Sequence, residues 1–312
     1  MKRMAAMRSS GAAPPRVSEA IESRENRWLK RFRASLSGDS LAHGEAEEIV
    51  GIEGARLVDA ALRSGVEVLA VLFSDNGAKH VSRLAPRIPA EARLLRTSDR
   101  LFASASGTET PQGIAALVRP RAATFDDLVT GIPLVLVMAG VQDPGNVGTL
   151  VRTAEAFGAS GIAACAAGAI GTANPFAPKA LRASAGGALR VPILRGISAP
   201  VLLAQLRVAG VRTYAACPEH VSGTGSVGAA KETHAPWEID WRAPAALLLG
   251  NEGAGLPAEL VRSSDAIVRI PQASRGQRDP AAREEDSSAE SLNAAIAGSI
   301  LLYEAARQRG LA

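Results

Sequence analysis

The chain of 312 residues is poor in the side chains that build metal sites and disulfides. It has only two cysteines, Cys165 and Cys217, and four scattered histidines, and no C-x-x-C pair occurs. Structural zinc sites need closely spaced Cys and His ligands, so we expect no metal. Two cysteines in a chain this long suit a reducing compartment. Each lies in an apolar run, where a buried free thiol is the expected state.

Long hydrophobic runs are also missing. No run of about 18 apolar residues occurs, so we expect no membrane-spanning helix. Residues 1–22 lack the apolar core of a secretory signal, and Gly11-Ala-Ala-Pro-Pro15 within them is typical of disorder. We therefore predict a disordered tail at 1–22 and a cytoplasmic protein with no membrane partner.

Aromatic residues make up only 4% of the chain, so its core must rest on Ala, Val, Leu and Ile. Hydrophobic residues at 47% and charged residues at 21% are ordinary for a soluble globular protein. The length suggests two domains. We place them at 24–120 and 132–312, joined by a linker at 121–131.

Positive charge is concentrated in the first domain. Residues 1–120 hold 18 Lys and Arg against 14 Asp and Glu, whereas residues 121–312 are balanced. Most of the local excess falls on a predicted amphipathic helix, 24–36, which carries Arg24, Arg27 and Arg31 on one side and Trp28, Phe32 and Leu36 on another. Such a patch suits a polyanion such as nucleic acid. The alternative is a solvated helix face.

Strand-like and helix-like segments alternate through both domains, which indicates an α/β fold. In the first domain we expect a small α/β unit with strands at 48–51, 66–73, 93–96 and 114–118 and a helix at 54–63. In the second, the alternation predicts a parallel sheet with helices on both faces. We place its strands at 133–139, 161–166, 191–194, 211–217, 245–250 and 266–270. Its helices are expected at 149–157, 177–186, 199–209, 256–263 and 291–309, with an irregular loop at 219–243.

The first of three polar segments, Asp143-Pro-Gly-Asn-Val-Gly-Thr-Leu-Val-Arg152, follows a buried strand-like run. In open α/β sheets ligands bind beyond the carboxyl ends of strands. We expect Asn146 to be a helix N-cap and Arg152 to lie near the same site. An arginine in a helix can also be a plain surface charge.

The second segment, Gly250-Asn-Glu-Gly-Ala-Gly-Leu-Pro257, also follows an apolar run. Its glycines permit close backbone approach, but their spacing fits neither G-x-G-x-x-G nor a P-loop. Glu252 would repel a pyrophosphate and favour a cationic ligand. A simple turn before the next helix is the alternative.

The third segment is divided. Ile270-Pro271 closes a strand, and Ser291-Leu-Asn293 opens the last helix, whose apolar stripe suits a core or a subunit interface. Nineteen residues, 272–290, most of them polar, separate the two parts. They form either a substrate lid or a neutral surface loop.

With these motifs in this order, residues 133–309 resemble the SpoU/TrmH family of RNA ribose 2′-O-methyltransferases. The intervening Pro178-Lys-Ala-Leu-Arg-Ala-Ser-Ala-Gly186 belongs to the likeness. The first domain is similar to the family's RNA-substrate-binding extension, a small α/β/α sandwich like the ribosomal proteins that bind kink-turns; its closing turn, Thr108-Glu-Thr-Pro-Gln-Gly113, carries that likeness. The family joins Ile-Pro to Ser-Leu-Asn by a much shorter link, so 272–290 is a departure from its pattern.

The resemblance implies a deep trefoil knot, S-adenosylmethionine as cofactor, RNA as substrate and a homodimer. It places Arg152, Asn146, Glu252, Ser291 and Asn293 at the catalytic site. Carried over in the same way, Gly250, Ile270 and Leu292 bind the cofactor, and we expect Lys179 and Arg182 to join Arg24, Arg27 and Arg31 in binding RNA.

The expected activity is methylation of a ribose in large-subunit ribosomal RNA, because relatives with this extension often act there. A tRNA ribose methyltransferase and a non-catalytic RNA-binding protein are the alternatives. Arginine is an awkward base because its guanidinium keeps its proton. Arg152 therefore acts either as a base tuned by RNA phosphate or as an anchor for that phosphate.

Overall fold

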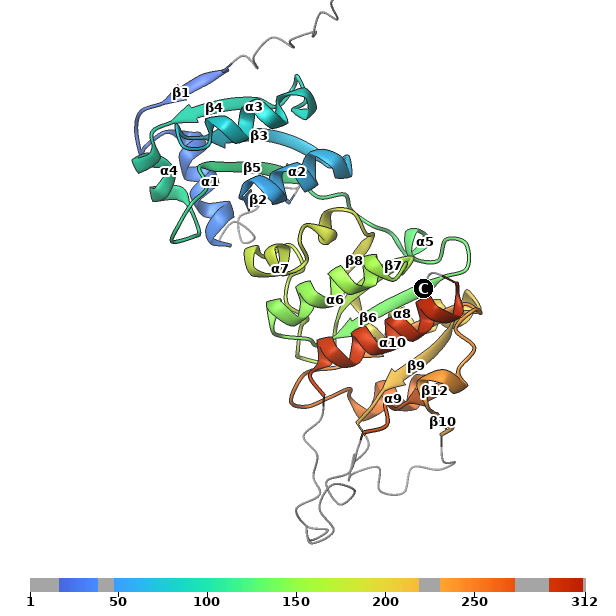
Figure 1. Ribbon diagram of the computed structural model, residues 1–312. Helices are drawn as coiled ribbons and strands as arrows, with labels where there is room; N and C mark the ends of the chain where they lie inside the picture. The colour runs from blue at the N-terminus through green and yellow to red at the C-terminus, as the bar shows by residue number, and fades with distance from the viewer. Residues whose placement is uncertain (1–16, 39–47, 219–230, 273–291, 311–312) are drawn as a thin grey trace, which may run out of the picture. The chain divides into compact units, whose positions relative to one another are not determined.

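The computed structural model describes residues 17–38, 48–218, 231–272 and 292–310, and it divides into two compact units. The first unit ends at Pro120 and the second begins at Arg121. Within the described residues, no helix is both long and apolar enough to cross a membrane. Each unit has its own sheet and its own core, so each is described separately (Figure 1).

The first unit is a five-stranded mixed sheet with the strand order β1-β4-β3-β5-β2. The two pairs β1–β4 and β3–β4 are parallel, and β5 runs antiparallel to β3 and β2. The strands are β1 (Glu19–Ile21), β2 (Val50–Glu53), β3 (Glu67–Phe73), β4 (Arg93–Thr97) and β5 (Ile114–Arg119). The helices are α1 (Arg27–Ser37), α2 (Ala55–Ser64), α3 (Ala78–Leu84) and α4 (Asp99–Ala105).

The sequence patterns located four of these strands and α1 and α2, but missed α3 and α4. The tail prediction is wrong for its last residues. Glu19–Ile21 form β1 on the edge of the sheet, where Ile21 is only 2% exposed and joins the core. A three-residue strand lacks a period that sequence alone can show. Residues 1–16 lie outside the described residues.

The second unit is a seven-stranded sheet whose described strands all pair in parallel, in the order β10-β12-β9-β11-β6-β7-β8. This confirms the predicted parallel α/β architecture. Its strands are β6 (Leu134–Ala139), β7 (Gly161–Ala166), β8 (Ile193–Ser198), β9 (Arg212–Ala216), β10 (Thr233–His234), β11 (Ala245–Leu249) and β12 (Ala266–Val268). The central strands β6 and β11 are buried at every position, as expected for strands covered on both faces.

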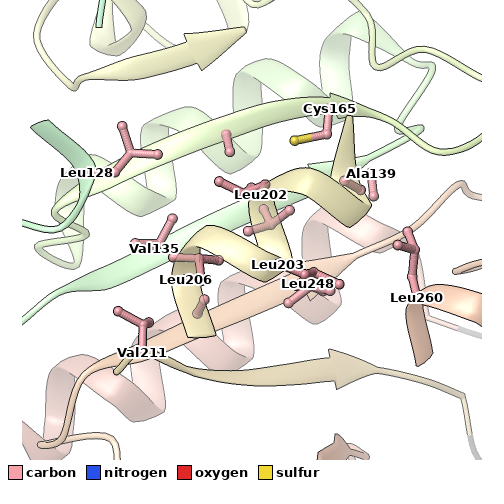
Figure 2. Packing of buried hydrophobic residues seen from close by; sticks show 14 of the residues in the cluster. Leu128, Val135, Ala139, Cys165, Leu202, Leu203, Leu206, Val211, Leu248 and Leu260 are labelled. Atoms are coloured by element: carbon pink, nitrogen blue, oxygen red, sulfur yellow. The ribbon is translucent and has the colours of Figure 1, made fainter. Parts of the chain in front are cut away.

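Helices cover both faces of this sheet. The second unit contains α5 (Phe125–Leu128), α6 (Pro144–Ala156), α7 (Pro178–Ala183), α8 (Ala199–Val208), α9 (Ala258–Ser263) and α10 (Ala294–Gln308). On one face, Leu202 and Leu206 of α8 pack with Val135 and Leu248 of the central strands (Figure 2). On the other face α10 packs on α6 and β11, so closely that a methyl group on Gly298 would lie 2.5 Å from the side chains of Leu150 and Leu249.

Three predicted boundaries in the second unit are wrong. Helix α6 begins at Pro144, five residues before the predicted start, because Asp143 caps it and proline suits the first helical position. The predicted loop 219–243 contains β10 and a 3-10 turn, Pro236–Glu238, in its described part. The last helix begins at Ala294, with Asn293 as its N-cap. Residues 273–291, which hold most of the insertion and Ser291, lie outside the described residues.

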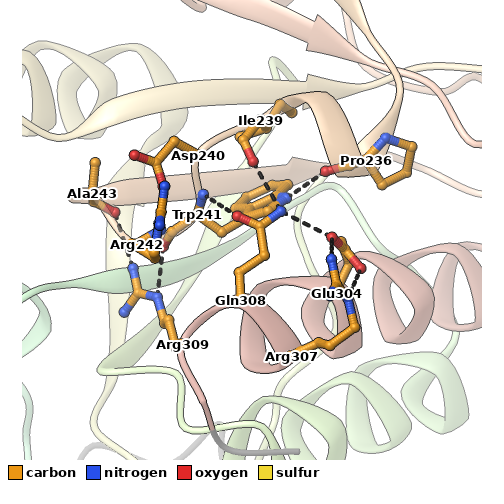
Figure 3. A network of polar contacts seen from close by, with 10 residues as sticks. All are labelled: Pro236, Ile239, Asp240, Trp241, Arg242, Ala243, Glu304, Arg307, Gln308 and Arg309. Carbon is orange, nitrogen blue, oxygen red and sulfur yellow. Dashed lines mark hydrogen bonds and ion pairs between the residues drawn. The ribbon is translucent and has the colours of Figure 1, made fainter.

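The end of α10 is fastened to the start of the sheet. The Arg309 guanidinium donates hydrogen bonds to the carbonyl oxygens of Ile132, Pro133, Trp241 and Ala243, at 2.7–3.0 Å. Figure 3 shows the bonds to Trp241 and Ala243. Gln308 adds bonds to the backbone of the same segment. These contacts join the carboxyl end of the chain to the amino ends of β6 and β11, at the edge opposite the polar segments.

Candidate active site

The first polar segment turns directly from β6 into α6. The Asp143 carboxylate caps α6 by accepting the backbone N–H of Asn146 at 2.9 Å. It also accepts a 2.7 Å bond from Nζ of Lys179 on α7, and these bonds keep the pKa of Asp143 below its usual value. The expectation that Asn146 is the N-cap is therefore wrong. Asn146 occupies the third helical position, which leaves its amide free to face the site.

The second polar segment forms a tight turn after β11. Gly250 packs against the backbone of the returning chain, because an added methyl would lie 2.4 Å from the carbonyl carbon of Gly255. Asn251 closes the turn by exchanging backbone bonds with Gly255. Its side-chain amide donates to the carbonyl of Gly140 and to Oε1 of Gln142, so the turn is tied to the end of β6.

Glu252 connects the first two segments. Its carboxylate accepts the backbone N–H groups of Gln142 at 3.2 Å and Asp143 at 3.1 Å, and Nδ2 of Asn146 at 2.9 Å. Burial would raise the pKa of Glu252, but the hydrogen bonds from Asn146 and the backbone outweigh it and lower the pKa. The side chain is therefore an ionised, fully engaged acceptor that fixes the start of α6.

Asn293 brings in the third segment. Its Nδ2 donates to Oδ1 of Asn146 at 3.1 Å, while its own Oδ1 caps α10 by accepting the N–H groups of Ala295 and Ile296. The Asn146 amide is thus oriented from both sides, since its nitrogen faces Glu252 and its oxygen faces Asn293. Three segments distant in sequence meet in one chain of hydrogen bonds.

A cavity of about 560 Å³ opens beside this network. Gly250, Ile270 and Leu292, the three expected cofactor residues, all line it, and so does Glu252. The other lining residues come from the ends of β9, β11 and β12, from α9 and from the start of α10, and include Ala216, Cys217, Leu256, Val261, Arg269 and Leu301. The volume is in the range of small-molecule sites.

Arg152 and Arg182 lie apart from the network. Arg152 is exposed on α6, about 9 Å along the helix axis from Asn146, and has no hydrogen bond or ion pair within the described part of the chain. Arg182 is exposed on α7. Lys179 of the same helix lies beside the network through its ion pair with Asp143.

Sequence reasoning missed three members of the site. Asp143, Gln142 and Asn251 hold the two turns together. The sequence pattern identified the polar segments around them but assigned no role to these three residues. Asp-Pro at a strand end is an N-cap signature that would have identified Asp143. Gln142 and Asn251 carried no local signal, because their partners are about 110 residues away in sequence. Among the described residues, no group of three His, Cys, Asp or Glu could hold a metal ion.

Comparison with known proteins places this site in a family. Residues 133–279 match the SpoU rRNA Methylase family, and residues 44–116 match the MRM3-like substrate binding domain. The chain is 33% identical over 253 residues to the 23S rRNA (guanosine(2553)-2′-O)-methyltransferase RlmP of Bacillus subtilis, covering 81% of this chain and 86% of that protein. It is 30% identical to the 23S rRNA (uridine(2479)-2′-O)-methyltransferase of Streptomyces viridochromogenes, covering 97% of this chain and 96% of that one.

Solved structures agree with the sequence matches. The AdoMet-bound rRNA methyltransferase of Sinorhizobium meliloti superposes with a TM-score of 0.72 at 30% identity, over 92% of this chain and 97% of that one. The SpoU methyltransferase AviRb of Streptomyces viridochromogenes, in complex with AdoMet, gives 0.70 at 26% identity over 91% and 98%. These matches extend over both units.

Proposed function

Because the chain belongs to the SpoU rRNA methylase family, we propose that it transfers a methyl group from S-adenosylmethionine to a ribose 2′-hydroxyl of large-subunit ribosomal RNA. The observation that carries the proposal is the hydrogen-bonded chain Asn293–Asn146–Glu252 beside the cavity. The 2′-hydroxyl is the group that distinguishes RNA from DNA. The relatives named above are methyltransferases of 23S rRNA, which favours ribosomal RNA over tRNA.

The cavity suits the proposed cofactor in size and chemistry. Apolar side chains and backbone from Gly250, Ile270 and Leu292 would hold its adenosine, and the turn at Gly250 leaves no room for a side chain. Glu252 supplies negative charge at the same wall, which favours a positively charged sulfonium. When bound, S-adenosylmethionine supplies the electrophilic methyl group.

The residues of this chain orient and activate the nucleophile. We assign Arg152 to the RNA: its planar guanidinium can hold a phosphate with two parallel hydrogen bonds and polarise the adjacent hydroxyl. Asn146 and Asn293 are held in one orientation by Glu252 and by the cap of α10, so they can position the ribose without rearrangement. Lys179 and Arg182 add positive charge beside α6 for neighbouring phosphates. Ser291 lies outside the described residues, and on the family resemblance we keep it in the proposed catalytic set.

Two larger features belong to the proposal. The first is the trefoil knot expected for this family, which would pass near the cavity where the ends of β11 and β12 and the start of α10 meet. The second is a homodimer through α10 and α6. Ile296 and Tyr303 of α10 are 54% and 48% exposed, and Tyr303 lies edge-on to Phe157 at the end of α6. Such a contiguous apolar face is typical of an interface.

The experiment that tests the function is a map of ribose methylation in ribosomal and transfer RNA from cells with and without this protein. The proposal predicts that one site in large-subunit ribosomal RNA is lost and is restored by the wild-type gene but not by Arg152→Ala. Loss of a tRNA site instead would assign the enzyme to tRNA. No lost site would favour a non-catalytic RNA-binding protein.

A further inference from the structure

Three arginines surround one tryptophan on the first unit. The guanidinium carbons of Arg27, Arg31 and Arg93 lie 5.8, 5.4 and 5.9 Å from the centre of the Trp28 ring. Arg27 and Arg31 stand one turn apart on α1, whereas Arg93 begins β4 (Figure 1). The cluster is therefore assembled by the fold, and the run of charges on α1 does not by itself reveal it.

The Trp28 ring is a fixed support. It is only 8% exposed and packs in the core of the unit with Leu29 and Phe32. A guanidinium within about 6 Å of a tryptophan ring is attracted to it by roughly 0.5–1 kcal/mol at an exposed site. Three such contacts limit the conformations of side chains that are otherwise among the most flexible in proteins.

Charge in this region is only partly neutralised. Glu25 is paired with Lys30, and Arg33 is bonded to the carbonyl of Ser104, so these two cations of α1 are engaged within the unit. Arg27 and Arg93 have no ion pair with any residue in the described ranges. Because all three guanidinium carbons lie within 6 Å of the same ring centre, no two of them can be more than about 12 Å apart, and at separations below the Debye length of roughly 8–10 Å they repel one another.

From this arrangement we infer that Arg27, Arg31 and Arg93, supported by Trp28, form a phosphate-binding clamp for the RNA backbone. The inference rests on the proposed function and deepens it, by naming where the first unit holds the substrate. Guanidinium groups bind phosphates with two parallel hydrogen bonds, and an anion between them would relieve their mutual repulsion. Trp28 is a positioning residue, because its ring is buried beneath the arginines and cannot stack on a base.

Binding of the full chain to an unmodified transcript of large-subunit ribosomal RNA tests the clamp, with salt varied from 50 to 300 mM. We expect Arg93→Gln to weaken binding about 5- to 10-fold at 100 mM salt. It should also reduce the slope of log affinity against log salt by roughly 0.7–0.9 for each lost phosphate contact. Arg27→Gln should behave alike. The matched control is Arg83→Gln on α3, an exposed arginine of the same unit, which should change neither value.

Trp28→Phe separates positioning from charge. The smaller ring keeps the core apolar but attracts guanidinium groups less, so affinity should fall about 2- to 3-fold with an unchanged salt slope. Circular dichroism and thermal melting confirm that each variant is folded. The inference is overturned when Arg93→Gln and Arg83→Gln bind alike, or when polyglutamate displaces the RNA at equal charge concentration, which would point to an acidic protein partner.

Failure of the clamp is distinguishable from failure of the proposed function. Methyl transfer to the transcript by the wild type is measured separately. If the wild type transfers methyl groups but Arg93→Gln does not change RNA binding, the clamp is refuted and the proposed methyltransferase activity stands. If RNA binding depends on the arginines but no methyl transfer occurs in the presence of S-adenosylmethionine, the clamp is supported and the proposed methyltransferase activity is contradicted.

Discussion

Asn293 donates a 3.1 Å hydrogen bond to Asn146 across 147 residues of sequence, and this bond joins the caps of two helices into one site. Asn293 caps α10, and Asn146 receives the cap of α6 from Asp143. Both helices therefore begin at the same point beside the cavity. The two caps determine where the side chains of the site lie, so a substitution that disrupts one cap should also displace the residues at the other.

Replacing Arg152 should separate catalysis from cofactor binding. Arg152 lies outside the lining of the cavity and is exposed on α6. We expect Arg152→Ala to reduce methyl transfer by at least about 100-fold, in line with the loss of a group that acts on the reacting hydroxyl. Calorimetric affinity for S-adenosylhomocysteine should change less than about 2-fold. Arg152→Lys keeps the charge but loses the fork; recovery to wild-type rates would argue against bidentate phosphate binding.

Glu252→Gln should destabilise the second unit. The Gln amide keeps one acceptor oxygen but puts an NH2 group in place of the other, so at least one of the N–H groups of Gln142, Asp143 and Asn146 loses its acceptor, at a cost on the order of 1 kcal/mol. Because the folded pKa of Glu252 lies below its ordinary value of 4.5, its ionisation stabilises the fold above that pH. The difference in unfolding free energy between wild type and variant should be largest at pH 7.

Acidification provides the control for Glu252. The stabilisation is lost as the pH falls from the ordinary pKa of 4.5 through the lowered pKa of the folded state, so the unfolding free energies of wild type and variant should converge as the protein is acidified below pH 4.5. A difference that stays constant on acidification below pH 4.5 would contradict this origin of the effect.

The two thiols should differ in reactivity. Burial raises the pKa of Cys165 to about 12, so it should stay unreactive in the native protein. Cys217 is half-buried in the wall of the cavity, and burial raises its pKa as well. We expect slow labelling of Cys217 by a disulfide reagent at pH 8.

Ligand protection gives this experiment its control. Saturating S-adenosylhomocysteine should slow the labelling of Cys217 by at least about 5-fold, because the ligand would cover the wall that carries it. Cys217→Ser shows which thiol has reacted. Labelling at the same rate with and without the ligand would mean that it binds elsewhere.

Arg309 should contribute strongly to stability although it pairs with no carboxylate in the described chain. Desolvation lowers the pKa of its guanidinium, and four carbonyl oxygens accept its hydrogen bonds. Arg309→Met would remove all four hydrogen bonds, with only the Pro133 carbonyl keeping a second donor among the described residues, the N–H of Ala245, and we expect a loss of about 2–4 kcal/mol. The melting temperature should fall by roughly 5–15 °C. The neighbouring Arg307→Met, which breaks only an exposed pair with Glu304, should cost less than about 1 kcal/mol.

The proposed dimer is tested by Ile296→Asp. This side chain is 54% exposed on α10, so a charge there should leave the fold intact. In a dimer that uses this face the charge would be buried, and light scattering should show a shift to monomers. Val208→Asp on α8, 91% exposed, is the matched control. Two unchanged dimers would assign the interface to another face, and loss of the dimer in both variants would show that the effect is not specific to α10.

The sequence predicted the architecture well because buried parallel strands leave a simple mark. Leu134–Ala139 and Ala245–Leu249 are continuous apolar runs, and both are central strands whose following turns are joined by Glu252. The three residues expected to bind the cofactor also line one cavity, since motif order and strand order together bring them to one edge.

The rest depended on contacts that no local pattern encodes. Helix α6 started early because Asp143 and Pro144 outweighed the weak period of its first turn. Gln142 and Asn251 form a hydrogen bond because the pairing of β6 with β11 brings them together. Arg93 joins Trp28 only because β4 passes beside α1. Such partners are set by topology, which sequence periodicity does not report.

Gly298 has a consequence for how the enzyme would be regulated. Its missing side chain lets α10 rest directly on Leu150 and Leu249, so the helix that carries the exposed Ile296 and Tyr303 also contacts α6 and β11. With two copies joined through this helix, any shift of α10 at the interface would move Asn293. Specific activity would then rise with protein concentration, and dilution that separates the two copies would lower it.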